Sequence, residues 1–187
     1  MEATKRLFLA LVIPDELKQK LNTWRERNLY NLEQAPIPAD NYHITLVYIG
    51  AVARPHLIEL RKQLSAIVND SFTLDINRTD YWPTPKVLHL MPTSIPPRLI
   101  DLQRKVNKAT KLSGLPEETR PYRPHVTIYR KIKPEQFEQL EQDGLPEPNV
   151  SIPISQFAIY ESISSPEGVY YKKLDTFNLI KSTALIV

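Results

Sequence analysis

Two stretches, NYHITLVY at residues 41–48 and RPHVTIYR at residues 123–130, repeat one pattern in different halves of the chain: a histidine, one residue, then a threonine. Residues i and i+2 of a β-strand point to the same face. If both stretches are strands that line one cleft, two imidazoles and two hydroxyls converge there. The pairs are His43 with Thr45, and His125 with Thr127.

That set of groups suits a phosphodiester. One imidazole can take a proton from an attacking water while the other gives one to the leaving oxygen, and the hydroxyls can donate hydrogen bonds to the non-bridging oxygens. An unperturbed pKa of about 6.5 allows one ring to be neutral and the other charged near neutral pH. A single His-x-Thr is most often a plain strand fragment, but two copies at corresponding places favour a shared site.

The composition is that of one compact domain. A chain of 187 residues, 42% of them hydrophobic, is enough for one buried core, so we expect a single domain over residues 1–187. A formal net charge of +3 suits a polyanionic partner without requiring one. The absence of cysteine excludes disulfides and fits a cytoplasmic protein, and the apolar run at residues 7–13 is too short to span a membrane.

Hydrophobic periodicity predicts an α+β fold. Helices are expected at residues 14–30, 54–70, 96–114 and 133–142. Strands are expected at residues 6–14, 42–50, 71–82, 86–92, 123–132, 151–162 and 168–179. The order strand, helix, strand, helix, strand occurs approximately twice. We therefore expect two pseudo-symmetric lobes of antiparallel sheet, with helices packed outside and the active cleft between the lobes.

The motifs HITL and HVTI resemble the paired signatures of the two-histidine phosphoesterase superfamily. The stretches at residues 6–14 and 157–174 are similar to its RNA 2′,3′-cyclic phosphodiesterase branch, historically called 2′-5′ RNA ligase. The likeness covers most of the chain. It implies an enzyme without metal or cofactor that opens a terminal 2′,3′-cyclic phosphate to a 2′-phosphate, and that joins RNA ends by the reverse reaction at the same site.

The resemblance also implies roles for the two motifs. His125 would be the base that activates water, and His43 the acid that protonates the departing 3′ oxygen. Thr45 and Thr127 would hold the phosphate oxygens. The sequence itself is symmetric with respect to acid and base.

Three more residues match family positions. Arg130 corresponds to an arginine that follows the second motif and would bind phosphate. Tyr48 and Tyr171 correspond to aromatic positions and are candidates for stacking on a base. The chain departs from the family at Ala35 and Pro36, where relatives often have Arg-Trp, so the resemblance does not say how a base beside the phosphate is held.

Two alternatives stay open. The substrate could be a small cyclic nucleotide or a 2′-5′ oligoadenylate instead of an RNA end, which the missing Arg-Trp pair favours. The chain could also be a module that binds RNA ends or nucleotides without turnover, although a pure binder does not need two titrating groups. In each case the expected partner is RNA or a nucleotide, with no membrane, and the protein is expected to be a monomer.

Other candidate residues receive structural interpretations. His56 is predicted to lie on the surface and His89 to be structural. Neither motif has a second histidine or a carboxylate at ligand spacing, so no metal site is expected. Basic residues between positions 120 and 133, interleaved with Tyr122 and Tyr129, predict a track for an RNA backbone.

Overall fold

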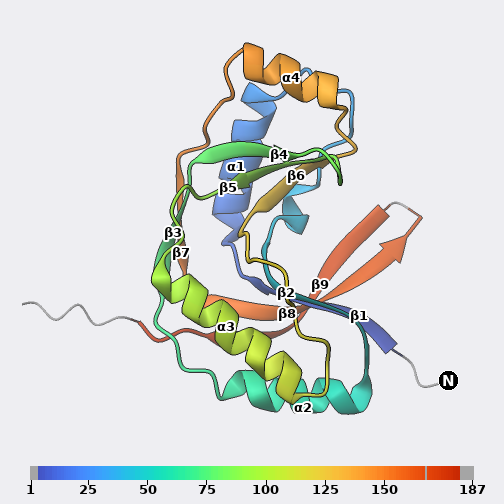
Figure 1. Cartoon of the computed structure of the whole chain (residues 1–187), viewed down its shortest axis with the longest axis vertical. Helices are drawn as coiled ribbons and strands as arrows, with labels where there is room; N and C mark the ends of the chain where they lie inside the picture. The colour runs from blue at the N-terminus through green and yellow to red at the C-terminus, as the bar shows by residue number, and fades with distance from the viewer. Residues whose placement is uncertain (1–3, 167, 182–187) are drawn as a thin grey trace, which may run out of the picture.

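The computed structural model describes residues 4–166 and 168–181, and confirms the α+β class (Figure 1). The helices are α1 (Asp15–Asn28), α2 (Arg54–Ser65), α3 (Pro97–Leu112) and α4 (Pro134–Gln142), with a 3-10 turn η1 (Ala39–Asn41). The strands are β1 (Thr4–Leu11), β2 (Ile44–Ala53), β3 (Phe72–Ile76), β4 (Arg78–Trp82), β5 (Val87–Met91), β6 (Val126–Arg130), β7 (Val150–Ile154), β8 (Gln156–Ser165) and β9 (Gly168–Asn178).

The strands form antiparallel sheets at two ends of the molecule, joined by a two-stranded ribbon. One sheet has the order β2-β1-β8-β9, another has the order β4-β5-β6, and β3 pairs with β7 between them. Figure 1 shows α2 and α3 beside the four-stranded sheet, and α1 and α4 beside the three-stranded one. The two lobes with helices outside are therefore as predicted.

The lobes do not correspond to the two halves of the chain. Helix α3 comes from the second half but packs against α2 and β2. Helix α1 comes from the first half but meets β6, where the Tyr129 hydroxyl donates to the Leu29 carbonyl at 3.1 Å and the Arg25 guanidinium lies 5.7 Å from the Tyr129 ring centroid. Each lobe is thus built from both halves of the chain. The two contacts of Tyr129 hold the end of α1 on the lobe that carries the second motif.

Two predicted strands were wrong in extent because the chain changes sheets within them. The stretch 71–82 divides at Asn77 into β3 and β4, and the stretch 151–162 divides at Ser155 into β7 and β8. The Asn77 side chain exchanges two hydrogen bonds with Thr93, at 2.9 and 3.0 Å, which holds the crossing point. The even-numbered residues of β3 are buried but the odd-numbered residues of β4 are, so the alternation changes phase at Asn77. Such a change does not by itself show which strands pair.

One continuous hydrophobic core extends through both lobes. Helix α3 contributes the face that its spacing predicts, and it ends before Gly114, whose positive φ of 73° favours glycine. The buried residues of that face include Leu99, Leu102, Val106 and Ala109. The expectation of one domain over residues 1–187 stays a prediction, which this shared core supports.

Candidate active site

The two motifs lie at the edges of different sheets. Strand β2 is an edge of the four-stranded sheet and β6 an edge of the three-stranded sheet. His43 and His125 lie within the predicted strands but one residue before the observed ones, while Thr45 and Thr127 lie within β2 and β6. In both motifs the histidine and threonine are half-buried and the residue between them is buried, as expected for side chains that share a face.

Both histidines are held in the same way. His43 Nδ1 lies 2.7 Å from the Asn41 carbonyl oxygen, and His125 Nδ1 lies 2.7 Å from the Arg123 carbonyl oxygen. A carbonyl oxygen only accepts hydrogen bonds, so each Nδ1 carries the proton and donates it. Nε2 of each neutral ring is then the nitrogen that can accept a proton in a reaction.

Burial and nearby positive charge keep both rings neutral. Burial lowers the pKa of His43 to about 4, and the Asn41 carbonyl partly opposes this. The charge of Arg130 lowers this pKa further, as does that of His125 when its ring is protonated. Burial also lowers the pKa of His125, again with Arg130 acting in the same direction. The positive charge of Arg130 therefore acts on both imidazoles, and the same charge would attract a phosphate to the space beside them.

Aromatic rings enclose His43. The Phe8 and Tyr171 ring centroids lie 4.8 and 4.9 Å from the His43 centroid, and Tyr171 meets the imidazole edge to face at 85°. Tyr171, which the sequence predicted as a substrate-binding residue, thus contacts the first histidine directly. Phe8 was missed by the sequence reasoning, because its place in an apolar strand is that of a core residue.

Rings enclose His125 as well. Trp82 lies 4.5 Å and His89 5.4 Å from the His125 ring centroid, and Trp82 and His89 are 4.1 Å apart. Trp82 was also missed, since the predicted strand 71–82 gave no sign of the face that meets the second motif. His89 is fully buried, as a structural residue would be, but it lies beside a motif histidine.

Burial lowers the pKa of His89 to about 4. Its Nε2 has no hydrogen-bond partner among the residues that the structure describes. Register places it opposite Thr127 of β6 on one side and Asp80 of β4 on the other. His89 is therefore a third imidazole, buried directly behind His125.

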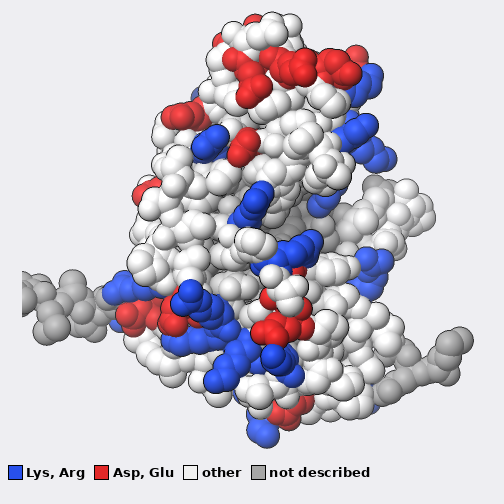
Figure 2. Space-filling view, viewed as in Figure 1, with Lys and Arg blue, Asp and Glu red and all other residues white. Residues whose placement is uncertain are grey.

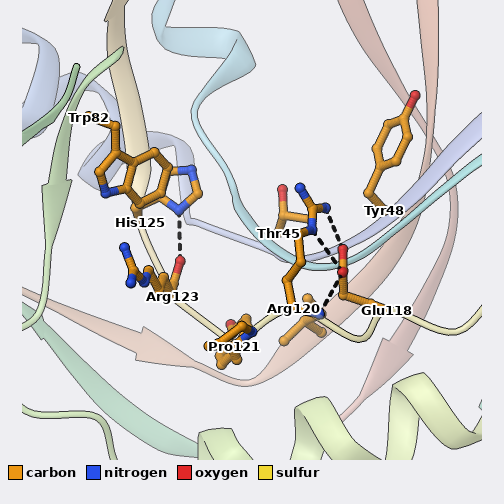
Figure 3. A pocket seen from close by; sticks show the side chains of 10 residues that line it. Thr45, Tyr48, Trp82, Glu118, Arg120, Pro121, Arg123 and His125 are labelled. Carbon is orange, nitrogen blue, oxygen red and sulfur yellow. Dashed lines mark hydrogen bonds and ion pairs between the residues drawn. The ribbon is translucent and has the colours of Figure 1, made fainter. Parts of the chain in front are cut away.

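A pocket of about 390 Å³ opens between the lobes (Figure 3). Figure 3 shows Trp82 and His125 at one side, Tyr48 at the other, and Thr45 with Arg120 between them. The Tyr48 ring is half exposed, and its hydroxyl accepts a hydrogen bond from Arg6 at 2.9 Å. The lining comprises Thr45, Leu46, Tyr48, Trp82, Glu118, Arg120, Pro121, Tyr122, Arg123 and His125.

Of the predicted site residues, the structure brings His125, Thr45 and Tyr48 into the pocket lining and His43 and Tyr171 into ring contact beside it. Arg130 is exposed at the end of β6, and Thr127 lies in β6 between it and His125. The roles of these residues stay predictions.

The predicted RNA track between residues 120 and 133 was wrong at Tyr129. Tyr129 is buried in the core, and the Tyr122 hydroxyl is buried while its side chain packs against the core at the pocket wall. Arg120 is held by Glu118, and Lys133 lies 3.6 Å from Glu33. Strand β6 turns the Tyr129 ring into the core, so this ring offers no stacking surface for a chain of bases. Tyr122 precedes β6 and lines the pocket.

The described ranges contain no group of three or more His, Asp or Glu side chains that could hold a metal ion. None of the described helices is both long and apolar enough to cross a membrane.

Comparison with known proteins agrees with this geometry. A family model described as the 2′-5′ RNA ligase superfamily matches residues 13–164. The chain belongs to this superfamily. It is 28% identical over 164 residues to the RNA 2′,3′-cyclic phosphodiesterase of Escherichia coli strain K12, covering 87% of this chain and 89% of that protein. It is 26% identical over 185 residues to the protein of the same name from Bacillus subtilis strain 168, covering 92% and 95%.

Solved structures of similar proteins have the same fold. A crystal structure of a phosphoesterase superposes with a TM-score of 0.85 at 26% identity, covering 96% of this chain and 100% of that one. A crystal structure of Escherichia coli LigT complexed with 3′-AMP gives a TM-score of 0.84 at 27% identity, covering 95% and 99%. The family resemblance noted in the sequence is thereby confirmed.

Proposed function

We propose that this protein is an RNA 2′,3′-cyclic phosphodiesterase that opens a terminal cyclic phosphate to a 2′-phosphate by acid–base catalysis with two histidines, without a metal. The observation that carries the proposal is the matched pair of imidazoles, each anchored through Nδ1 to the carbonyl two residues before it. That anchoring leaves two Nε2 atoms for proton transfer. The superfamily and the names of the relatives support the same activity.

In this reaction His125 Nε2 takes a proton from water as the water oxygen forms a bond to phosphorus. The bond between phosphorus and the 3′ oxygen breaks, and that oxygen takes a proton from His43 Nε2. The assignment of base and acid follows the family resemblance. Thr45 and Thr127 would donate hydrogen bonds to the non-bridging oxygens, and Arg130 would stabilise their charge.

The low pKa of the His43 ring suits this scheme only when substrate is bound. In the empty site burial and the Arg130 charge hold the ring neutral. A phosphodiester carries one negative charge, which offsets Arg130 and favours the imidazolium. Binding of the anion would therefore load the acid with its proton. The reverse reaction, which joins a cyclic phosphate to a 5′-hydroxyl, would use the same groups in opposite roles.

A small cyclic nucleotide is the second candidate substrate. The pocket volume of about 390 Å³ is within the range of sites for small molecules, and the 3′-AMP complex of the solved relative is compatible with a mononucleotide. That the protein is a monomer stays a prediction. A location in the cytoplasm stays a prediction.

The deciding experiment is turnover of a short RNA with a 2′,3′-cyclic phosphate end, with EDTA present, by the unaltered protein and by His43→Ala and His125→Ala. Removing one general acid or base should lower kcat by about 10² to 10⁴. His56→Ala is the matched control, because this histidine is outside the pocket lining and bonds to the Ser113 carbonyl on α3.

Formation of a 2′-phosphate that both cleft variants lose and the control retains would support the proposal. Activity that EDTA abolishes would contradict the metal-free mechanism. Turnover of 2′,3′-cyclic AMP with none of RNA would favour the small-nucleotide substrate. Binding of RNA without turnover of either substrate would favour a non-catalytic module.

A further inference from the structure

Charge is distributed unevenly between the two ends of the molecule. Helix α3 carries five basic side chains and one acidic one, while α4 carries three glutamates and no basic side chain. The net charge of the whole chain is only +3, so α3 is a concentrated positive region. Figure 2 shows Lys and Arg gathered over α3 and leading towards the hollow of the pocket, with Asp and Glu over α4 at the far end. An approaching polyanion is therefore drawn to the α3 side.

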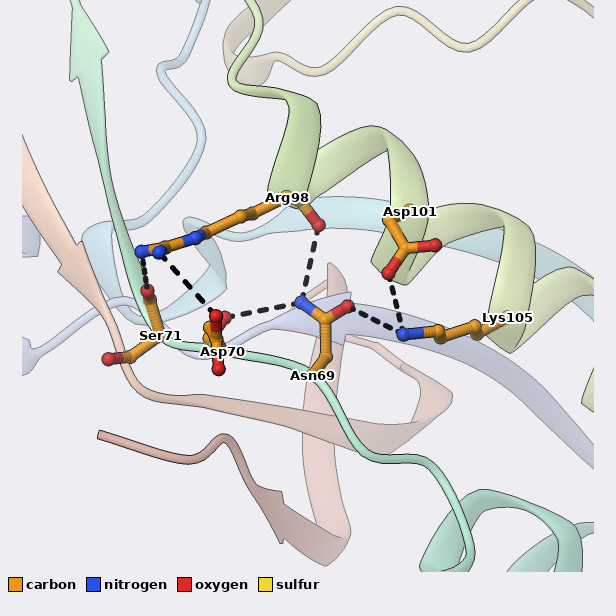
Figure 4. Close-up of polar contacts among 6 residues, drawn as sticks. All are labelled: Asn69, Asp70, Ser71, Arg98, Asp101 and Lys105. Carbon is orange, nitrogen blue, oxygen red and sulfur yellow. Dashed lines mark hydrogen bonds and ion pairs between the residues drawn. The ribbon is translucent and has the colours of Figure 1, made fainter. Parts of the chain in front are cut away.

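Some of these cations fasten α3 to the rest of the fold. Figure 4 shows Lys105 between Asp101, at 2.6 Å, and the Asn69 side chain. Arg98 donates to the Ser71 carbonyl at 3.1 Å and lies 3.5 Å from Asp70. These two side chains are occupied by structural contacts.

Arg104 and Lys108 are different. Both are exposed, and neither forms an ion pair with any residue in the described part of the chain. Together with Lys111, which pairs with Glu117 at 2.7 Å, they are spaced i, i+4 and i+7. They form one stripe about 10 Å long on the side of the helix opposite the core. We call Arg104, Lys108 and Lys111 the α3 basic stripe.

The stripe is connected to the pocket. The Asn107 side chain donates to the Glu118 carbonyl at 2.8 Å and accepts from the Glu118 N–H at 2.9 Å, so the wall segment at Glu118 rests on α3 next to Lys108. Glu118 and Arg123 both line the pocket, and Arg123 forms no ion pair within the described ranges. This part of the pocket wall is therefore held by the helix that carries the stripe.

We propose that the RNA strand bearing the cyclic phosphate leaves the pocket over Glu118 and runs along α3, with its backbone phosphates on Arg104 and Lys108. The inference rests on the proposed function and narrows its substrate to a single-stranded RNA end of several nucleotides. Spaced exposed cations bind phosphates without reading sequence. A mononucleotide has no further backbone phosphates to place on these side chains.

The test compares two double variants with the same change of charge. Arg104→Gln with Lys108→Gln removes the unpaired cations of the stripe. Lys20→Gln with Arg27→Gln is the control, because both side chains are exposed on α1, beside the other sheet, and form no ion pair among described residues. Glutamine keeps helix propensity close to that of Arg and Lys.

Each protein is assayed on 2′,3′-cyclic AMP and on a ten-nucleotide RNA with a cyclic phosphate end, from about 50 to 200 mM salt. The stripe variant should lose about fivefold to tenfold in kcat/KM on RNA at the lowest salt. Its plot of log kcat/KM against log salt should be shallower by about 1.4, at about 0.7 for each single-strand phosphate contact. Turnover of cyclic AMP should not change. The control pair should behave as the unaltered protein.

Binding of the same RNA, followed by fluorescence anisotropy, separates the two proposals. If the unaltered protein turns over neither substrate, the proposed function is wrong, while weaker RNA binding by the stripe variant alone still supports the path along α3. Three results would overturn the path along α3. They are equal effects of the two double variants on RNA turnover, an equal loss of kcat/KM on RNA and on cyclic AMP, and unchanged RNA binding by the stripe variant.

Discussion

The pKa of His43 links the packing of the cleft to its chemistry. The ring lies against Phe8 and Tyr171, and burial lowers its pKa from 6.5 to about 4. At pH 7 about one such ring in a thousand carries a proton, compared with about one in four at an unperturbed pKa. If His43 is the acid, kcat/KM should therefore fall about tenfold for each pH unit between pH 7 and 8, since that constant reports the free enzyme.

Tyr171→Ala is the perturbation that tests this cause. It removes one of the two rings and lets water solvate the imidazolium, so we expect the pKa of His43 to rise to between about 5 and 6, towards its usual 6.5. A rise of one unit in the pKa corresponds to about 1.4 kcal/mol in favour of the charged imidazolium. Tyr171→Phe is the matched control, because it keeps the ring and should leave the pKa near 4.

The assay is an NMR titration of the imidazole carbon-bound protons from pH 3.5 to 8. The chain has four histidines, so His43→Gln identifies the signal. A midpoint near 6.5 for His43 in the unaltered protein would refute the burial of this ring. A midpoint that stays low in Tyr171→Ala would refute the role of Tyr171 in shielding it.

Two further predictions concern stability and can be checked by urea unfolding. The pKa of buried His89 is about 4 in the folded state against 6.5 unfolded, so the unfolded state binds more protons between these values and acid destabilises the fold. The free energy of unfolding should be lower by about 2 to 3 kcal/mol at pH 4.5 because of His89. His89→Phe should remove most of this acid destabilisation, so an unchanged pH dependence of stability in this variant would contradict the burial of His89. Asn41→Ala removes the 2.7 Å hydrogen bond from the Asn41 side chain to the Val169 carbonyl and should cost about 1 kcal/mol at pH 7. It should also lower kcat/KM, because that bond fixes the backbone segment whose carbonyl accepts from His43 Nδ1; full stability and activity would count against this.

Much of the local structure was predictable from the sequence. The helices lie within or close to the predicted ranges, because apolar spacing reports which face of a helix is buried. The two His-x-Thr motifs were placed at strands for a similar reason, since alternation reports which residues share a face. Their match to a known family added the expectation of a cleft between lobes.

The pairing of strands and the packing of segments far apart in the chain were not predictable from the sequence. The stretches divided at Asn77 and Ser155 were each predicted as a single strand. Burial changes phase at Asn77 and becomes consecutive after Ser155, but neither change says which sheet the next segment joins. Tyr129 was expected beside an RNA backbone, but the pairing of β6 turns it into the core against α1. The register of β5 against β6 is what brings His89 next to the second motif.

The sequence by itself therefore determined the elements, their buried faces and the repeated acid–base pair, because these depend on side-chain direction within a few residues. Only the tertiary structure decided that Phe8 and Tyr171 enclose His43, that Trp82 and His89 enclose His125, and that a wall anchored on α3 closes the pocket. Those contacts join segments far apart in the chain, and they are set by sheet order and register, which no local pattern encodes.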